Sequence, residues 1–535
     1  MNSSLLKPSS FQPRAYQEAL AASAIGKGNT LVVLPTGLGK TIIAALVMAH
    51  RLSSVKNSKA LFLAPTRPLC VQHREALSKL FAFTESEVAL LTGMVAKKKR
   101  SQLFADARIV CATPQTIASS MEDGSIELGD YSIVVFDEAH RGVKNYSYTS
   151  IAEKYSGTGN AYILGLTASP GSSRQRIKEV CDALKIGSVE MRTREDSDVK
   201  PYVKDTSVDW VQVELPEEFF DVRRLLGEFI ERKTQSLKEM GFLRVAMKKM
   251  PRRLAVALQQ RVSAEISRHG AKRPALYSAA SSIAAILKVQ HALELVETQG
   301  IAAAKSYAER LEEQARQPGA SKAVKSLLKD SSVSLAFAKI KALMERSLEH
   351  PKLKLLTELV ELEVLQKPNP KILVFTQFRD SATRVVESLN ALKGVKAARF
   401  VGQASRGEKD AGLSQKEQAQ IIQDFKEGKH NVLVATSVGE EGIDIPSVDL
   451  VVFYEAVPSE IRAIQRRGRT GRQEAGRVVI LVTKKTSDEA YLWSQYRKEK
   501  QMVKTITRMK ETGLEVGEGR EKKLKPGEQA RLTDY

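Results

Sequence analysis

Short apolar runs alternate with segments of helical periodicity along the N-terminal part of the chain. The runs contain few polar residues and cover residues 31–34, 60–65, 88–91, 108–112, 133–136 and 162–166. Strands of this kind are buried on both faces, as in a parallel sheet that has helices on either side. The pattern therefore predicts an α/β domain over residues 1–214.

The same alternation returns at Lys371. Its apolar runs cover residues 372–375, 397–401, 432–435, 450–453 and 478–482. We expect a second parallel-sheet domain over residues 351–510, ending in a helical stretch that starts near Lys484. Residues 511–535 are rich in glycine and charge, so we expect a flexible tail there.

Residues 215–350 follow a different pattern, because strand-like runs disappear and helical periodicity dominates. We predict an all-helical domain inserted between the two α/β domains. Lys and Arg outnumber Asp and Glu in it; most of these charges would be solvated, and a few would contact phosphates. The stretch Glu231-Arg232-Lys233 resembles part of a nuclease motif, but the aspartate which that motif requires falls on Leu237. We therefore exclude a nuclease site here.

The first apolar run leads into a glycine-containing loop and then into a helix pattern. The loop is PTGLGKT, residues 35–41. This order is the setting of a phosphate-binding loop, in which backbone N–H groups face an anion at a helix N-terminus. Lys40 would reach the terminal phosphates and Thr41 would hold Mg²⁺. The match is imperfect, since Leu34 stands where the signature has its first glycine, and an ordinary strand-to-helix turn is the alternative.

An acidic pair follows another apolar run, in the stretch Asp137-Glu138-Ala139-His140. A carboxylate at a strand end opposite a phosphate loop is placed to hold Mg²⁺, so we assign that role to Asp137. The adjacent Glu138 could orient and deprotonate an attacking water. A solvated acidic turn is the alternative for both.

Polar residues also follow the other apolar runs, and ligands of parallel sheets bind beyond the carboxyl ends of the strands. In the first domain these stretches are Pro65-Thr66-Arg67, Thr92-Gly93, Thr113-Pro114-Gln115 and Thr167-Ala168-Ser169. In the second domain they are residues 376–379, 402–403, 436–437 and 439–446.

Arginines gather near the end of the second domain, in the stretch QRRGRTGR at residues 465–472. Arg469 and Arg472 are three positions apart, so on a helix both could point at one γ-phosphate and stabilise its charge. A nucleic-acid-binding patch is the alternative. The intervening glycines and the second sheet favour the phosphate role.

The composition of the chain indicates what kind of partner it binds and in which cellular compartment it resides. The 535 residues carry a formal net charge of +21, which favours a polyanionic partner. The three cysteines, Cys70, Cys111 and Cys181, are too far apart in sequence to indicate a zinc site or a disulfide framework. The N-terminus lacks the apolar region of a signal peptide, and apolar runs are too short to span a membrane. We expect a soluble, cytoplasmic protein associated with the nucleoid.

Taken together, these blocks resemble the motifs of superfamily 2 helicases. They occur in family order over most of the chain: PTGLGKT, PTRPL, TPQ, DEAH, TAS, VFTQFRD, ATSVGEEGIDIP and QRRGRTGR. The helical insert and the stretches VFTQFRDSA, FVGQAS and GLSQKEQ resemble the helicase part of archaeal Hef and of its eukaryotic relative, the Fanconi anaemia group M translocase. The resemblance implies two RecA-like domains separated by a thumb-like helical insert. It does not imply fork cleavage, because this chain ends before the nuclease module of Hef.

The resemblance also implies roles for individual residues, with ATP and Mg²⁺ as cofactors. The nucleotide site of the first domain would comprise Gln17 at the adenine, Thr36, Gly37, Leu38, Gly39, Lys40 and Thr41 at the phosphates, Asp137 at the metal and Glu138 as the base. The second domain would add Gly442, Asp444, Gln465, Arg469 and Arg472. Thr167 and Ser169 would couple hydrolysis to movement. Residues along one nucleic-acid strand would be Thr66, Arg67, Gly93, Thr113, Gln377 and Thr436.

We therefore expect an ATP-driven DNA helicase or translocase that remodels forked or branched DNA and moves 3′ to 5′. A separate nuclease partner is conceivable, and a monomer is expected. One alternative is a double-stranded RNA translocase or sensor, although such sensors usually add a cysteine-rich zinc domain that these cysteines cannot build. Another is a non-catalytic nucleic-acid scaffold, which Lys40, Glu138, Arg469 and Arg472 disfavour.

Overall fold

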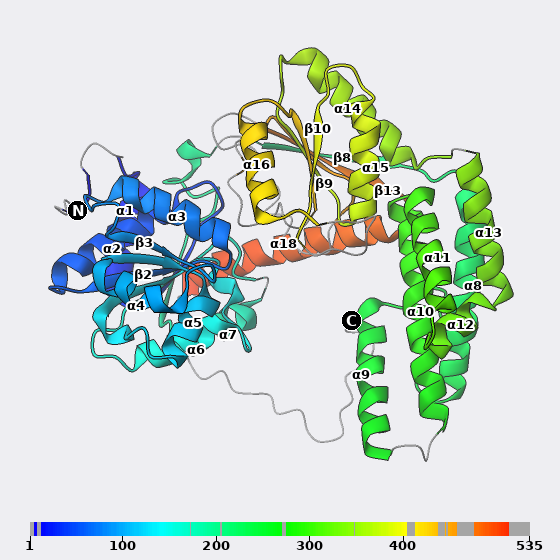
Figure 1. The fold of residues 1–535 in the computed structure, drawn as a ribbon, viewed down its shortest axis with the longest axis horizontal. Coiled ribbons are helices and arrows are strands. Elements are labelled where there is room, and N and C mark those ends of the chain that lie inside the picture. Colours follow the sequence, from blue (N-terminus) through cyan, green and yellow to red (C-terminus); the bar gives the residue numbers. More distant parts are fainter. Residues whose placement is uncertain are drawn as a thin grey trace.

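The computed structural model describes residues 5–7, 12–171, 173–203, 206–269, 274–346, 348–403, 412–436, 445, 448–456 and 476–512. Several residues of the expected nucleotide site lie outside these ranges: Gly442, Asp444, Gln465, Arg469 and Arg472. Residues 513–535 of the expected tail also lie outside them. Figure 1 shows two α/β units, a helical insert and a long helix that runs between them.

The first unit is built on a parallel sheet of seven strands in the order β3-β4-β2-β5-β6-β1-β7. The strands are β1 (Thr30–Val33), β2 (Lys59–Leu63), β3 (Val88–Leu91), β4 (Ile109–Ala112), β5 (Tyr131–Phe136), β6 (Ile163–Thr167) and β7 (Ser188–Met191). All except β7 correspond to the apolar runs. The sequence did not indicate β7 because it pairs along only one side, with β1, and carries Ser188 and Glu190.

Helices cover both faces of this sheet, as near-continuous apolar strands require. They are α1 (Ala15–Lys27), α2 (Lys40–Ser54), α3 (Arg67–Leu80), α4 (Lys97–Asp106), α5 (Pro114–Glu122), α6 (Ser147–Ser156) and α7 (Arg174–Ala183). Alternate residues of β5 enter different cores. Ile133 and Val135 pack with α1 and α2, whereas Val134 and Phe136 pack with α6 and α7. Short 3₁₀ turns lie at η1 (Leu128–Asp130), η2 (Ala139–Arg141) and η3 (Lys200–Tyr202).

The second unit has a parallel sheet of six strands in the order β10-β11-β9-β12-β13-β8. The strands are β8 (Thr206–Val213), β9 (Ile372–Phe375), β10 (Ala397–Phe400), β11 (Val432–Ala435), β12 (Leu450–Phe453) and β13 (Gly476–Thr483). Its described helices include α14 (Pro351–Gln366), α15 (Arg379–Asn390) and α16 (Gln415–Lys426). Together the two sheets confirm the predicted fold class of two RecA-like parallel-sheet domains with a helical insert.

Strand β8 precedes the insert in sequence yet extends the second sheet by pairing with β13. The boundary expected after residue 214 assigns this strand to the first domain, which the pairing contradicts. The sequence pattern does not indicate this strand, because β8 is an edge strand whose polar residues alternate with apolar ones. We propose that the boundary lies before Thr206.

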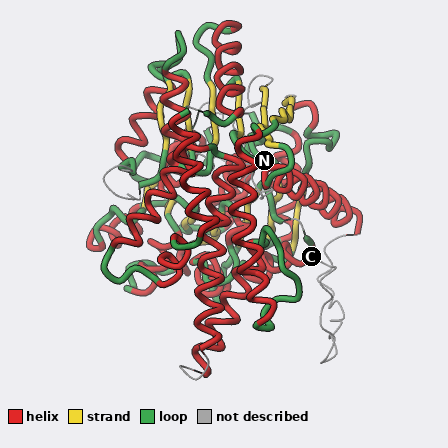
Figure 2. The backbone as a smooth tube through the Cα atoms, turned by 90° about the vertical axis from the view of Figure 1, so that its right-hand side faces the viewer, coloured by secondary structure: helices red, strands yellow, loops and turns green. Residues whose placement is uncertain are grey.

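The insert consists of α8 (Glu217–Glu239), α9 (Arg252–His269), α10 (Pro274–Thr298), α11 (Ile301–Arg316), α12 (Lys322–Leu328) and α13 (Ser331–Glu345). Figure 2, turned so that the insert faces the viewer, shows helices running side by side there. By length and composition alone α10 could cross a membrane, but 56% of its apolar window is buried inside the insert. We interpret it as a core helix, because it packs against α8, α9 and α11.

Buried polar groups tie the insert to the second unit. The carboxylate of Glu297, on α10, accepts hydrogen bonds from Arg223, Lys249 and the Ser487 hydroxyl at 3.2, 2.7 and 2.8 Å. The Lys352 ammonium, fully buried on α14, pairs with the Asp488 carboxylate and lies over the Tyr454 ring. Lys352 also donates to the Thr298 carbonyl of the insert at 3.4 Å, so it contacts both parts. Removing one partner of a buried ion pair typically costs about 3–5 kcal/mol.

The long helix α18 (Ser487–Thr512) starts at this junction and ends on the first unit (Figure 1). Near its start, the Tyr491 hydroxyl donates a 3.0 Å hydrogen bond to Glu294 of the insert. Farther along, Met502 and Met509 are buried in the core formed with α6 and α7. One helix therefore contacts the insert, the second sheet and the first unit.

Candidate functional site

The loop between β1 and α2 has the backbone of an anion cradle. Gly37 and Gly39 have φ values of 83° and 79°, and Gly39 immediately precedes the first residue of α2. A side chain at Gly39 would be strained by this φ, and its Cβ atom would lie 2.5 Å from Nε2 of Gln17, which would have to move. The Lys40 ammonium donates to the Leu34 carbonyl at 3.3 Å, and the buried Thr36 hydroxyl has no hydrogen-bond partner among the residues that the structure describes. The Lys40 ammonium and the Thr36 hydroxyl can both donate hydrogen bonds to a phosphate bound in this loop.

Gln17 lies against this loop and is almost fully buried. Its Oε1 accepts a hydrogen bond from the Arg14 backbone N–H at 2.9 Å. Its Nε2 donates to the Leu38 carbonyl at 3.0 Å, and the Tyr16 hydroxyl donates to that same carbonyl at 2.8 Å. Gln17 therefore fixes the loop. Its Nε2 also lies 3.5 Å from the Tyr16 hydroxyl, and its expected contact with adenine stays a prediction.

One imidazole ring joins the two expected metal ligands. His73, buried on α3, lies 2.9 Å through Nε2 from Oδ2 of Asp137 and 3.4 Å through Nδ1 from Oγ1 of Thr41. The Phe62 ring packs against it, with ring centroids 4.4 Å apart. Thr41 and Asp137 come from the start of α2 and the end of β5, so His73 sets the spacing between these two oxygens.

The Asp137 carboxyl is held in its charged form. Burial raises its pKa, but the adjacent His73 and the Lys40 ammonium outweigh burial, so the pKa lies below its ordinary value. The Tyr148 hydroxyl donates a 2.7 Å hydrogen bond to the Asp137 carbonyl and orients the strand end. A charged carboxylate beside a threonine hydroxyl is a suitable donor set for Mg²⁺ when phosphate oxygens complete the shell. No cluster of three or more His, Cys, Asp or Glu that could hold a metal occurs within the part of the chain that the structure describes.

Glu138 adopts a left-handed backbone conformation, with φ 48° and ψ 49°. This conformation is uncommon for a residue with a side chain and often marks a functional turn. Oε2 of Glu138 is buried, lies 3.3 Å from Nδ1 of His140 and makes no hydrogen bond within the described part of the chain. A buried carboxylate oxygen with free acceptor capacity can bind and deprotonate a water.

A chain of polar contacts leads from this turn to α18. His140 lies 3.0 Å through Nδ1 from Oγ1 of Thr167, which also accepts a 3.1 Å hydrogen bond from the Ser169 backbone N–H. The Ser169 hydroxyl lies 3.4 Å from the sulfur of Met502. Movement at the Glu138 turn can thus reach a helix whose other end rests on the insert.

The expected nucleic-acid residues lie at the carboxyl ends of neighbouring strands. Gly93, Thr113 and Thr66 follow β3, β4 and β2, which are adjacent in the first sheet. Gln377 and Thr436 follow β9 and β11, which are adjacent in the second.

Arg67 forms a direct link between the units. Its guanidinium donates a hydrogen bond to Gln415 at the start of α16, so the two strand-end edges face each other. This contact joins the carboxyl edge of the first sheet to the second unit.

Sequence reasoning missed several residues that organise this site. His73 lies inside a helix, six positions beyond Arg67, and no strand end marks it. Tyr148 and Met502 resemble ordinary core residues of their helices. His140 falls within a recognised motif, but its contact with Thr167 depends on the third dimension.

Three family models match the chain. They are described as DEAD/DEAH box helicase over residues 12–177, ATP-dependent RNA helicase helical bundle over residues 218–346, and helicase conserved C-terminal domain over residues 351–474. The crystal structure of the Pyrococcus furiosus Hef helicase domain is 43% identical and has a TM-score of 0.68; the alignment covers 92% of this chain and 99% of that one.

Two curated relatives are longer proteins. A candidate ATP-dependent RNA helicase of Methanocaldococcus jannaschii is 38% identical over 94% of this chain and 62% of its own length. The ATP-dependent DNA helicase fml1 of Schizosaccharomyces pombe is 34% identical over 88% of this chain and 57% of its own length. The chain thus spans about three fifths of the length of these two relatives.

The first prediction concerns the buried carboxylate of Glu138. Glu138→Gln should lower the rate of nucleotide hydrolysis by about 100-fold or more while nucleotide affinity is retained, because the amide cannot accept the proton of the attacking water. Steady-state hydrolysis and binding of a fluorescent nucleotide measure the two effects. Glu127→Gln, at an exposed position, is the matched control. Unchanged turnover in Glu138→Gln would refute the assignment.

The second prediction concerns His73. Because its ring spaces Thr41 and Asp137, His73→Ala should raise the Mg²⁺ concentration needed for half-maximal nucleotide binding by about tenfold. Titration of Mg²⁺ against binding of a fluorescent nucleotide measures this shift without relying on hydrolysis. His50→Ala, an exposed histidine on α2, serves as the control. An identical Mg²⁺ dependence in wild type and His73→Ala would contradict the positioning role.

Proposed function

Because the chain belongs to the Hef-type DEAD/DEAH-box helicases, we propose that it is an ATP-hydrolysing motor that remodels forked or branched DNA. The observation that carries the proposal is the geometry at His73, which holds a phosphate-loop threonine and a strand-end carboxylate around one position. Residues expected to contact nucleic acid follow β2, β3 and β4, at the same carboxyl edge of the sheet. Hydrolysis and strand contact would therefore share one edge of each sheet.

In this mechanism the groups of the first unit act on the nucleotide phosphates. When bound, ATP with Mg²⁺ supplies the phosphoanhydride whose cleavage drives the cycle. Lys40 neutralises the terminal phosphates, Thr41 and Asp137 hold the metal, and Glu138 accepts the proton of the attacking water at its buried carboxylate. Gly442, Asp444, Gln465, Arg469 and Arg472 would approach from the second unit.

The bridge between the units would convert hydrolysis into movement. Lys40 and the two arginines would bind the same triphosphate, so loss of the terminal phosphate weakens the attraction between the units. The turn at Glu138, through Thr167 and Ser169, would pass this change to α18. Each cycle would shift strand contacts at Thr66 and Thr113 relative to those at Gln377 and Thr436. We propose 3′ to 5′ movement, as the resemblance implies.

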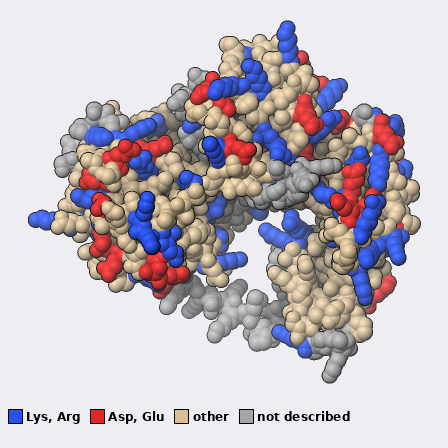
Figure 3. All heavy atoms as spheres, viewed as in Figure 1, with Lys and Arg blue, Asp and Glu red and all other residues tan. Residues whose placement is uncertain are grey.

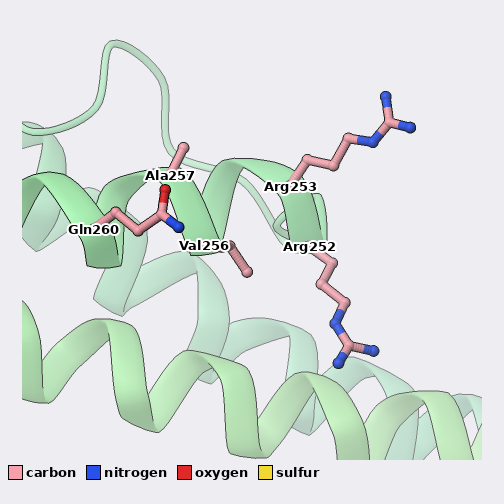
Figure 4. Close-up of a pocket in the computed structure, with 5 residues that line it drawn as sticks. All are labelled: Arg252, Arg253, Val256, Ala257 and Gln260. Atoms are coloured by element: carbon pink, nitrogen blue, oxygen red, sulfur yellow. The ribbon is translucent and has the colours of Figure 1, made fainter. Parts of the chain in front are cut away.

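The insert offers basic groups to the DNA. Lys and Arg side chains border the hollow between the first unit and the insert in Figure 3. A pocket of about 330 Å³ lies at the start of α9. The side chains of Arg252 and Val256 extend from one side of this helix, and that of Arg253 extends from the other (Figure 4). Exposed guanidinium groups in these directions could contact phosphates without reading sequence.

A motor on double-stranded RNA is the second candidate, because the Methanocaldococcus relative and the helical-bundle model are both named for RNA helicases. The Schizosaccharomyces relative is named as a DNA helicase, and the Hef-type match covers the whole helicase part. We favour DNA on that basis. We further propose an intracellular, monomeric protein, with any fork cleavage supplied by a separate nuclease.

The third prediction separates these functions. With ATP and Mg²⁺ the chain should separate strands or move branches on forked DNA and four-way junctions, with plain duplex DNA and double-stranded RNA as comparison substrates. Forked DNA should stimulate ATP hydrolysis more than RNA does. The reason is that one arm of a fork can contact the residues at the ends of the β-strands while another arm contacts the basic residues of the insert. Forks that carry only one single-stranded tail would give the polarity.

Glu138→Gln is the control, since it should bind the fork without separating it. Hydrolysis stimulated by DNA with no strand separation or branch movement on any branched substrate would contradict remodelling. Greater stimulation by double-stranded RNA would favour the second candidate.

A further inference from the structure

Both tryptophans of the chain lie together on the surface. Trp210, on the edge strand β8, and Trp493, on α18, have ring centroids 6.3 Å apart. Tyr496 lies 5.8 Å from Trp210 and 6.3 Å from Trp493, and each pair of rings is nearly perpendicular. We call Trp210, Trp493 and Tyr496 the aromatic corner.

The aromatic corner is not a buried core. The three side chains are 41%, 46% and 43% exposed, respectively. Among the described residues, neither indole N–H nor the Tyr496 hydroxyl has a hydrogen-bond partner. Large aromatic side chains are usually buried, and those exposed together commonly mark a binding surface. Three perpendicular rings also leave ring faces open to solvent, and a ring face is the part that stacks on a ligand.

The exposed face of α18 continues from the rings into positive charge. Arg497, Lys500 and Lys504 are exposed and lie within about 60° of Trp493 on the helix. None of them forms an ion pair with the residues that the structure describes. The opposite face carries the buried residues Met502 and Met509. From Trp493 to Lys504 the helix rises about 17 Å, with no carboxylate on its exposed face.

We propose that the aromatic corner and the following cations form a site for single-stranded nucleic acid, in which bases stack on the rings and the phosphates lie along α18. Exposed aromatic rings beside a line of Lys and Arg are the two components of sequence-tolerant single-strand binding. A duplex keeps its bases stacked on each other, so it cannot use the rings. A protein strand could pair with the edge of β8, but it would leave the cations of α18 without a partner.

This site rests on the proposed function, because a motor that separates strands generates a single strand.

The aromatic corner also lies close to the helix that links the two units. The corner joins β8 of the second unit to the first half of α18, whose second half inserts Met502 and Met509 into the core of the first unit. A strand held there would contact the element that links the units, away from the strand-end residues already described.

The fourth prediction uses the fluorescence of the chain itself. Because both tryptophans lie in the corner, their emission reports on this surface without background from other sites. Titration with an oligothymidylate of about twelve nucleotides, without ATP, should quench the emission to a plateau as bases stack. A duplex of equal length and heparin should bind the cations without quenching, because neither offers a free base.

Variants separate stacking from structure. Trp210→Leu with Trp493→Leu should weaken binding of the oligothymidylate, followed by anisotropy of a labelled strand, by about tenfold or more. Trp493→Tyr should retain most of the affinity, since it keeps an aromatic face. Tyr277→Leu, at an exposed tyrosine on α10, is the matched control and should bind as wild type does.

The outcomes are distinct. Stimulation of ATP hydrolysis by nucleic acid with no quenching and no loss in the leucine variant would overturn this inference and leave the proposed function standing. Absence of both binding and stimulation with every nucleic acid would remove the proposed function as well. Emission that changes with protein concentration alone would assign the corner to a second copy of the chain and overturn the inference.

Discussion

A strand of a parallel sheet presents side chains to a ligand mainly where it ends, and this constraint organises the whole molecule. In both sheets the candidate residues follow the carboxyl ends of the strands. The edges must face each other for residues hundreds of positions apart to act on one ligand. The contact from Arg67 to Gln415 brings them together at one point. The rest of the structure can be understood as the means of keeping these edges opposed.

Two sets of contacts maintain that arrangement. The first joins the insert to the second unit, through the hydrogen bonds of Glu297 with Ser487 and of Lys352 with the Thr298 carbonyl. His350 belongs to the same junction, and burial lowers its pKa to about 3, so its ring stays neutral and adds no further charge. The second set is α18, which ends in the core of the first unit beside Ser169. Nucleotide chemistry at one edge can therefore change the position of a body that includes the insert.

The sequence predicts the features that depend on local pattern, and it does not predict those that depend on how distant segments pack together. Every strand that is buried on both faces gave an apolar run, and the edge strands β7 and β8 did not, because exposure allows polar residues. Asp137 and Glu138 were identifiable because a strand end precedes them. His73 was not, since its function as a spacer exists only when α3 packs beside α2 and places the ring between Thr41 and Asp137. The aromatic corner likewise unites residues from β8 and α18 that no motif connects.

The central claim is that one bound nucleotide draws the two units together, and a distance between them tests it most directly. Spin labels at Lys56→Cys and Lys393→Cys would lie on exposed positions of the two units, and the native cysteines are buried. The distance between the labels should shorten when a non-hydrolysable ATP analogue, Mg²⁺ and DNA are added, and Arg472→Ala should abolish this change. The same distance with and without nucleotide, or shortening that persists in Arg472→Ala, would contradict the account.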